Sequence, residues 1–257
     1  MRRYSCFIYS ALIVFAIQSR ALLSAEEPLN IEETRKVLNS YYRVHGGNAR
    51  LGALISVRFT GSITFGETEK RYPFRLFKKR PNLVRYELEI DERKTWILSG
   101  KKDDFRSQSR TGSKLSEVTV IDDQAQLQML NHETAFDGLL WNLRQMGRQV
   151  KIYPEYRRER LSSYRCEVST IGSAFNGGSR QLGTVWLNAS SFYAEKRELP
   201  SEDGETITSI FSDYRIEGTY PFAFKVENVV GESLASKTLI DGIEVNPGAL
   251  DMFFELR

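Results

Sequence analysis

The clearest pattern in the chain is a strict alternation of apolar and polar residues. In 84–90 every second residue is apolar, and the residues between them are Arg or Glu. A period of two is typical of a strand with one buried face. Comparable segments predict eleven or twelve strands, at 55–65, 72–76, 84–90, 96–98, 117–121, 150–153, 160–171, 182–188, 192–199, 206–216, 222–230 and 238–245.

Helical spacing is found before the strands and at one place between them. Asn30 and Glu33 form a capping-box pattern at the start of a helix that Gly46 and Gly47 end, and a short helix at 49–54 follows. Asp122 or Asp123 caps a further helix. The apolar residues of 136–146 recur at intervals of three and four, which predicts another helix there. These last two helices either form a lid over the sheet or are one packed layer of the core.

The order of these elements predicts the fold class. The strands follow one another without the βαβ alternation of a parallel sheet, so we expect a mainly β protein with helices (α+β) and one large antiparallel sheet. Open sheets of this size curl. We therefore expect an unclosed half-barrel whose concave face is covered by helices. No linker or repeat divides 26–257, which we expect to be a single domain.

The first 25 residues have the layout of a secretory signal peptide. Arg2 and Arg3 precede an apolar run from Cys6 to Ile17, and small residues follow, with Ala21 or Ala25 at the cleavage point. The run is short for a membrane span, although a retained anchor is the alternative. We expect 1–25 to be removed and the remaining chain to be exported to the periplasm.

Charge and composition exclude several classes of function. Three of the 36 Lys and Arg residues lie in the leader, so the remainder carries 33 charges of each sign, which argues against a nucleic-acid partner. The chain has two Cys and two His, too few for a zinc cluster. Cys166 is expected to be a buried small hydrophobe. His45 is expected to place a favourable charge at a helix end, and His132 has no second ligand at metal-binding spacing.

The sequence also lacks a nucleophile elbow, a phosphate loop and a paired-Cys motif. We therefore expect no enzyme, no cofactor and no metal site. What remains is an aromatic content of 12% in a sheet that must curve. Such a sheet could enclose an acyl chain, because burial of each methylene contributes about 0.8 kcal/mol. The same residues could equally fill a solid core, and composition does not separate the two.

Three short motifs resemble LolA-like periplasmic lipoprotein carriers, also described as outer-membrane lipoprotein-sorting proteins. The first is Lys79-Arg80-Pro81-Asn82-Leu83, which runs into the strand that ends at Ile90. The second is Tyr42-Arg43-Val44-His45-Gly46-Gly47. The third is the C-terminal series Tyr220-Pro221-Phe222, Val245-Asn246-Pro247 and Phe253-Phe254-Glu255-Leu256. The resemblance covers roughly 30–257, in the same order.

The resemblance implies an unclosed antiparallel barrel with a helical lid over an apolar cavity. It also implies a monomeric carrier for acylated lipoprotein or lipid, with an inner-membrane exporter and an outer-membrane acceptor as partners. Arg80 matches the arginine that holds the lid by hydrogen bonds in these carriers. On this hypothesis nine residues line the cavity: Phe74, Tyr86, Leu88, Trp96, Leu98, Leu140, Trp186, Phe222 and Phe224.

Two alternatives stay open. A regulatory sensor of the same fold would recognise lipid or misfolded envelope proteins and act through a protein partner. A secreted hydrolase would need His45 or His132 in a cleft with a nucleophile.

Overall fold

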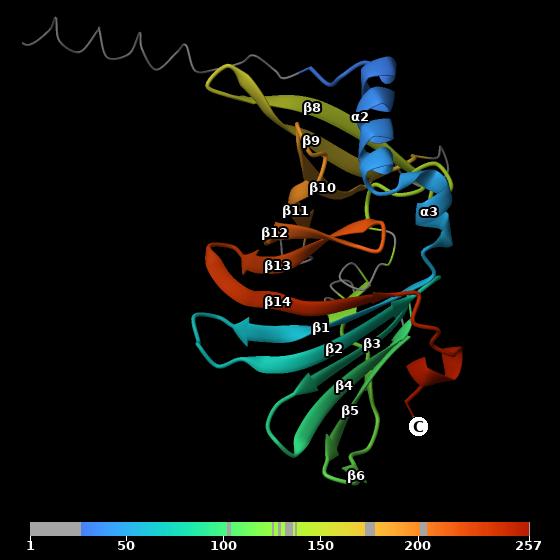
Figure 1. Ribbon diagram of the computed structural model, residues 1–257, viewed down its shortest axis with the longest axis vertical. Coiled ribbons are helices and arrows are strands. Elements are labelled where there is room, and N and C mark those ends of the chain that lie inside the picture. Colours follow the sequence, from blue (N-terminus) through green and yellow to red (C-terminus); the bar gives the residue numbers. More distant parts are fainter. Residues whose placement is uncertain are drawn as a thin grey trace, which may run out of the picture.

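The computed structural model describes residues 27–101, 104–124, 126–127, 130–131, 136, 138–172, 178–200 and 205–256. The leader at 1–25 and His132 lie outside these residues. The described strands form one antiparallel sheet of 14 strands, ordered β6-β5-β4-β3-β2-β1-β14-β13-β12-β11-β10-β9-β8, with β7 paired to β5. The sheet curves strongly and does not close (Figure 1). The predicted mainly β half-barrel with helices is thereby confirmed.

The elements have the following bounds: α2 Ile31–Val44, α3 Gly47–Ala53, β1 Ser56–Phe65, β2 Tyr72–Lys79, β3 Leu83–Glu89, β4 Lys94–Lys101, β5 Asp104–Thr111, β6 Lys114–Leu115, β7 Thr119–Ile121, β8 Arg148–Arg157, β9 Arg160–Thr170, β10 Gln181–Asn188, β11 Ala194–Pro200, β12 Thr206–Glu217, β13 Tyr220–Val230, β14 Ser233–Val245 and the 3₁₀ helix η1 Asp251–Phe254.

The N-terminal capping box is present as predicted. The Asn30 side chain accepts hydrogen bonds from the backbone N–H groups of Glu32 and Glu33, each at 3.0 Å, and the Glu33 carboxylate accepts from the Asn30 N–H. These bonds satisfy the otherwise unpaired donors at the start of α2. Gly46, with φ 94°, ends the helix and leads directly into α3.

One predicted helix is absent. Residues 138–147 form successive turns instead of the helix expected over 136–146. Asn142 has φ 50°, in the left-handed region, which interrupts the ladder of i→i−4 hydrogen bonds. The apolar residues of this segment are buried nonetheless, because Leu140 and Leu143 pack onto the sheet. The helical spacing therefore indicated which residues are buried but not the backbone conformation.

Helices and turns cover one face of the sheet, which we call the inner face. Val37 of α2 packs with the turn residues Leu140 and Leu143 on a buried cluster of β8, β9 and β10. A second cluster joins Leu127 to β3, β4 and β5, and a third surrounds Leu54, which follows α3. Because side chains of paired residues share a face, the strand register defines the inner face along the whole sheet. The opposite face is called the outer face.

Candidate functional site

Five of the nine residues predicted to line a cavity lie side by side on the inner face. Phe74 pairs with Leu88, which pairs with Trp96, and Tyr86 pairs with Leu98. The Phe74 and Tyr86 rings stack at 5.6 Å, and the Tyr86 and Trp96 rings meet edge to face at 6.4 Å. The strands β2, β3 and β4 therefore present a continuous aromatic and aliphatic surface to the interior of the half-barrel.

The exposure of this surface is graded. Phe74, Leu88 and Leu98 are at most 5% exposed, whereas Tyr86 and Trp96 remain half-buried. Desolvation by burial raises the pKa of the Tyr86 phenol, so this side chain is neutral and behaves as an apolar surface with one hydroxyl. Half-buried aromatic rings on a concave face can contact a ligand without unfolding of the core.

Three further predicted residues lie elsewhere on the inner side. Phe222 of β13 meets Phe59 edge to face at 5.8 Å. Phe224 is 3% exposed, and the Arg215 guanidinium lies 4.4 Å from the centre of its ring. Leu140 is 2% exposed within the cluster beneath α2. The predicted residues are thus spread along the half-barrel and do not form one compact group.

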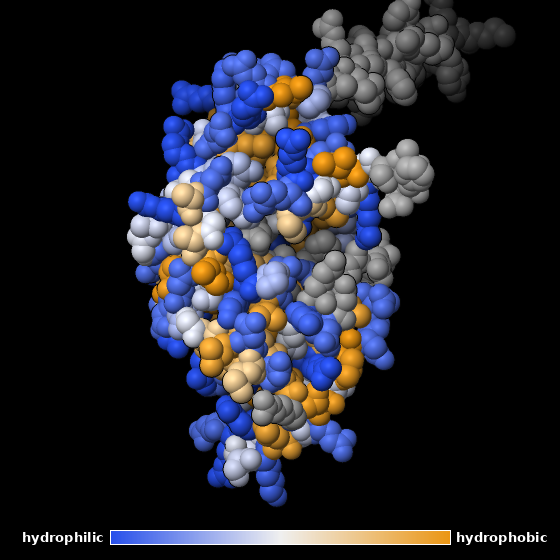
Figure 2. Space-filling model, turned by 90° about the vertical axis from the view of Figure 1, so that its right-hand side faces the viewer, coloured by the Kyte–Doolittle hydropathy of each residue, from blue (hydrophilic) through white to orange (hydrophobic). Residues whose placement is uncertain are grey.

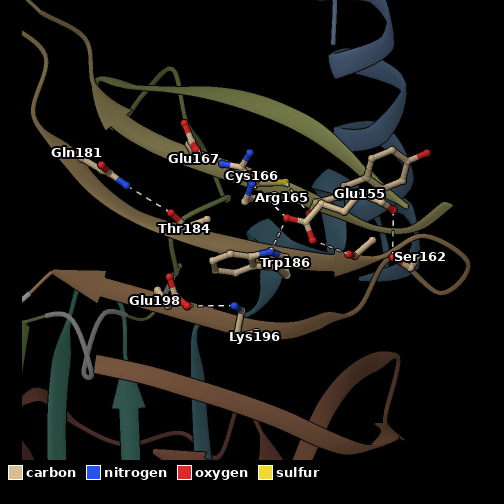
Figure 3. A network of polar contacts seen from close by, with 12 residues as sticks. Glu155, Ser162, Arg165, Cys166, Glu167, Gln181, Thr184, Trp186, Lys196 and Glu198 are labelled. Atoms are coloured by element: carbon tan, nitrogen blue, oxygen red, sulfur yellow. Dashed lines mark hydrogen bonds and ion pairs between the residues drawn. The ribbon is translucent and has the colours of Figure 1, made fainter. Parts of the chain in front are cut away.

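The expectation that Trp186 shares this face is wrong. Its strand neighbour Val185 belongs to the buried cluster beneath α2, so Trp186 points to the outer face. There its Nε1 donates to Glu155 at 3.0 Å, and Lys196 Nζ lies 3.6 Å from the ring centre (Figure 3). Residues 185–187 are all apolar, so the sequence did not indicate which of them face inward.

Sequence reasoning did not name several residues that complete the inner face. They are half-buried and apolar, and they continue the surface from β2 across β1 to β14 and β13: Phe59, Ile63, Leu76, Val226 and Ile243. The alternation of apolar and polar residues in 55–65 indicated the direction of Phe59 and Ile63.

The surface on the side of the molecule that carries α2 and α3 has apolar residues scattered between polar ones (Figure 2).

Arg80 lies where the resemblance placed it, against the lid. Its Nη1 donates to the carbonyl oxygens of Leu51 at 2.9 Å and Gly52 at 3.1 Å, and also to that of Leu54. Its guanidinium also lies 4.9 Å from the centre of the Phe136 ring. One side chain on the β2–β3 connection therefore holds the C-terminal end of α3 and contacts a second covering segment.

A second arginine, Arg148, donates hydrogen bonds to backbone carbonyl groups of the turns at 138–147, which also cover the inner face. Arg148, the first residue of β8, donates from Nη1 to the carbonyl oxygens of Gly138 at 2.7 Å and Leu139 at 3.3 Å. The Tyr42 hydroxyl of α2 donates to the Leu140 carbonyl at 2.9 Å. The turn segment is thus attached to both the sheet and α2.

Other candidate chemistry is limited. A shallow cavity of about 280 Å³ lies at the α2–α3 junction, lined by Asn39, Tyr42, Arg43, Gly46, Gly47 and Asn48. Among the described residues, no group of three or more His, Cys, Asp and Glu side chains could hold a metal ion. No helix in the described part of the chain is long and apolar enough to cross a membrane.

The two predicted single-residue features have different outcomes. Cys166 is fully buried, and this burial raises the pKa of its thiol to about 12, which fits the expected small hydrophobe. His45 donates from Nδ1 to the Tyr41 carbonyl at 2.8 Å. Burial lowers its pKa, with the hydrogen bond opposing this effect, so His45 favours the neutral form and not the expected charge.

Comparison with solved structures decides the fold. A crystal structure described as an outer membrane lipoprotein-sorting protein domain from Vibrio parahaemolyticus aligns over 88% of this chain and 97% of its own, with a TM-score of 0.54 and 12% identity. A LolA superfamily protein from Nitrosomonas europaea aligns over 86% and 97%, with a TM-score of 0.55 and 12% identity. The chain has a LolA-like fold.

A third structure, a DUF1329 family protein from Desulfovibrio piger, also shares the LolA-like fold of this chain. It aligns over 86% of this chain and 96% of its own, with a TM-score of 0.53 and 9% identity. No family model matches the sequence, and no curated protein matches it. The resemblance read from the short motifs is thus confirmed through the fold, at sequence identities that leave the function to be argued from the site.

Proposed function

We propose that the protein is a periplasmic carrier that binds the acyl chains of lipoproteins or lipids and transfers them towards the outer membrane. In this proposal 1–25 is a cleaved signal peptide and 26–257 is the carrier domain. The protein acts as a monomer, without enzymatic activity. It receives cargo from an inner-membrane exporter and gives it to an outer-membrane acceptor.

The observation that carries this proposal is the apolar inner face. Half-buried aromatic rings such as Tyr86, Trp96 and Phe59 lie on the concave side of an unclosed sheet. About ten methylenes placed on this surface would contribute about 8 kcal/mol before the cost of association is subtracted. Such binding needs no specific polar chemistry, which fits the scarcity of catalytic and metal-binding groups.

The arginine contacts supply a mechanism for exchange of cargo. Arg80 donates to carbonyl oxygens at the end of α3, a helix of seven residues. A helix of this length is not stable alone, so its position depends on such contacts. In the proposal, loss of the Arg80 contacts lets α3 move and opens the inner face, and their return closes it over the acyl chain.

Native mass spectrometry with lipid extraction, on protein purified from the periplasm, tests this function. Wild-type protein should carry acylated peptide or lipid, and W96E should lose it while keeping its circular dichroism spectrum. W186F, altered on the outer face, should keep the cargo. Wild-type protein that is repeatedly empty and takes up no acyl probe would contradict the carrier function. A stable complex with a membrane-bound regulator, without cargo turnover, would identify a sensor instead.

A further inference from the structure

The turn between β8 and β9 carries a cluster of arginines. Arg157 ends β8, Arg160 begins β9, and Arg158 and Glu159 lie between them. All four residues are exposed. We call residues 157–160 the basic tip. Figure 1 shows the turn that joins β8 and β9 at the upper left, directed away from α2 and α3. Three arginines and one glutamate therefore share one projecting turn.

The basic tip has no counterion within the described part of the chain. No ion pair or hydrogen bond there joins the side chain of Arg157, Arg158 or Arg160 to a carboxylate. The nearest carboxylate along β8 is that of Glu155, which is already paired with Arg165 at 3.1 Å. Arg157 also pairs directly with Arg160 across the two strands. Like charges in this position destabilise a hairpin, so an external anion between them would relieve the repulsion.

The backbone of the basic tip does not account for its composition. Arg158 has φ 51° and Glu159 has φ 63°, so both residues are in the left-handed region. Two-residue hairpin turns of this kind favour Asn-Gly, because most other side chains are strained there. Local turn chemistry therefore gives no reason for Arg and Glu at these positions. Strain of this sort is typical of functional positions.

The positive charge of the protein is local to this turn. Beyond the leader the chain carries 33 basic and 33 acidic residues, so it has no overall charge to attract an anion. The connections at 66–71, 90–93 and 231–232 contain at least as many acidic as basic residues. At an ionic strength of about 0.1 M, charges interact over about 10 Å, so a nearby surface responds to the basic tip and not to the whole chain.

Apolar groups beside the basic tip connect it to the inner face. Tyr156 is 65% exposed and pairs with Leu161, which is 37% exposed. Burial raises the pKa of the Tyr164 phenol, and the nearby Tyr156 phenol adds to this effect, so the two side chains are close. Tyr164 pairs with Leu187, a member of the buried cluster beneath α2. Tyrosine is common at the boundary between a membrane and water, where its ring and hydroxyl meet different surroundings.

We propose that the basic tip docks the protein on the anionic surface of a lipid bilayer, with its arginines in contact with lipid phosphate groups. A guanidinium presents several donors that match the geometry of a phosphate. A stable protein interface buries about 800 Å² on each partner, which exceeds what a turn of four residues offers. A bilayer, in contrast, presents many phosphates to the same few arginines. The contact goes beyond the carrier function, because it places one end of the inner face at a membrane and requires no acyl ligand.

Co-sedimentation with vesicles tests the proposal. Protein purified from the periplasm is mixed with vesicles of palmitoyl-oleoyl phosphatidylcholine, or with vesicles in which about 30% of this lipid is replaced by phosphatidylglycerol with the same acyl chains, at about 0.05 M salt. Because the acyl chains are identical, a difference in binding reports headgroup charge and not acyl binding. We expect about tenfold or more tighter binding to the anionic vesicles, since each net positive charge near such a surface strengthens binding about fivefold.

A pair of matched variants locates the contact. R157Q/R160Q makes the tip neutral, because Arg158 and Glu159 cancel, and it should bind both kinds of vesicle equally. The substitutions remove a like-charge pair, so unfolding does not explain a loss of binding. K70Q/R71Q removes two basic charges from exposed residues of the connection at 66–71, and it should keep the preference.

E159K tests the proposal in the opposite direction. It replaces the one acidic residue of the basic tip and should strengthen binding to anionic vesicles about tenfold or more. Equal binding of wild-type protein to both kinds of vesicle, an unchanged preference in R157Q/R160Q, an equal loss in K70Q/R71Q, or no gain in E159K would overturn the membrane contact. Any of these results would leave the carrier function standing, because that function is tested by bound cargo and not by vesicles.

Discussion

The guanidinium of Arg80 lies 2.9 Å from the carbonyl oxygen of Leu51, so a residue of the β2–β3 connection satisfies backbone groups at the C-terminal end of α3. The last carbonyl groups of a helix have no partner within the helix, and a cation is favourable beside them. The same Nη1 also donates to the Gly52 carbonyl at 3.1 Å. This contact joins the sheet to its cover and is the structural basis of the exchange mechanism proposed above.

Replacement of Arg80 should loosen α3 without unfolding the sheet. In R80L the carbonyl oxygens at 51–54 lose their donor, and amide hydrogen exchange there should accelerate about tenfold or more, since charge-assisted hydrogen bonds contribute about 1.5–3 kcal/mol. R80K should be intermediate, because a Lys ammonium lacks the planar fork. R75L is the matched control: Arg75 is a partly exposed residue of β2 that pairs with Glu87 and Glu89 and does not contact α3. Unchanged exchange in R80L would show that Arg80 does not hold α3.

The thiol of Cys166 should resist modification in the folded protein. Burial raises its pKa to about 12, so at about pH 8 the thiolate that reacts with iodoacetamide is scarce and inaccessible. Mass spectrometry should find almost no alkylation under native conditions and complete alkylation in denaturant. Rapid labelling of native protein would contradict the packing of α2 against β9, since Cys166 lies inside that cluster.

His45 should make stability depend on pH. Its ordinary pKa is 6.5, and burial lowers the pKa in the folded protein. The unfolded chain therefore binds a proton first as pH falls, and the free energy of unfolding decreases below about pH 6.5 until the folded pKa is reached. A tenfold difference in proton affinity corresponds to about 1.4 kcal/mol.

Urea unfolding of wild-type protein and H45Q measures this effect. The difference in stability between the two proteins should narrow as pH falls from about 7.5 to about 5, and carboxylates common to both cancel from it. The groups around His45 are the Tyr41 carbonyl and the Tyr41 and Tyr193 rings, at centroid distances of 4.3 Å and 6.0 Å. A difference that stays constant with pH would mean that His45 is not desolvated.

The capping box of α2 should contribute measurably to stability. N30A removes the acceptor for two backbone N–H groups and should lower the free energy of unfolding by about 1 kcal/mol. N39A, at an exposed position within the same helix, should have no such cost because Ala favours helix interiors. Equal effects of both substitutions in urea denaturation would indicate that the cap does not stabilise the helix.

Elements that are marked by local periodicity or by a cap residue could be predicted from the sequence. Elements whose conformation depends on contacts with distant parts of the chain could not. The alternation at 84–90 and the Asn30 cap correspond directly to β3 and α2. Strand β5 was not expected, because 104–111 is mostly polar and its position depends on pairing with β4. Asn142 has a left-handed backbone conformation, which interrupts the helix expected over 136–146. The spacing of apolar residues contains no information about such a conformation.

The site was predicted in part for the same reason. Phe74, Tyr86, Leu88, Trp96 and Leu98 share a face because each lies in a regular strand whose alternation fixes its direction. Trp186 lies between two apolar residues and next to a register shift in β10. Alternation of apolar and polar residues is therefore lost at this point, and the sequence did not show which face Trp186 occupies.

The most direct test of acyl binding uses the native tryptophans as position reporters. One variant keeps only Trp96, on the inner face, and another keeps only Trp186, on the outer face; phenylalanine replaces the other two of the three tryptophans in each. A palmitate brominated along its chain quenches fluorescence on contact. If the inner face binds acyl chains, the probe quenches Trp96 strongly and leaves Trp186 nearly unchanged. Bound probe that leaves Trp96 unquenched, or that quenches Trp186 equally, would contradict acyl binding on the inner face.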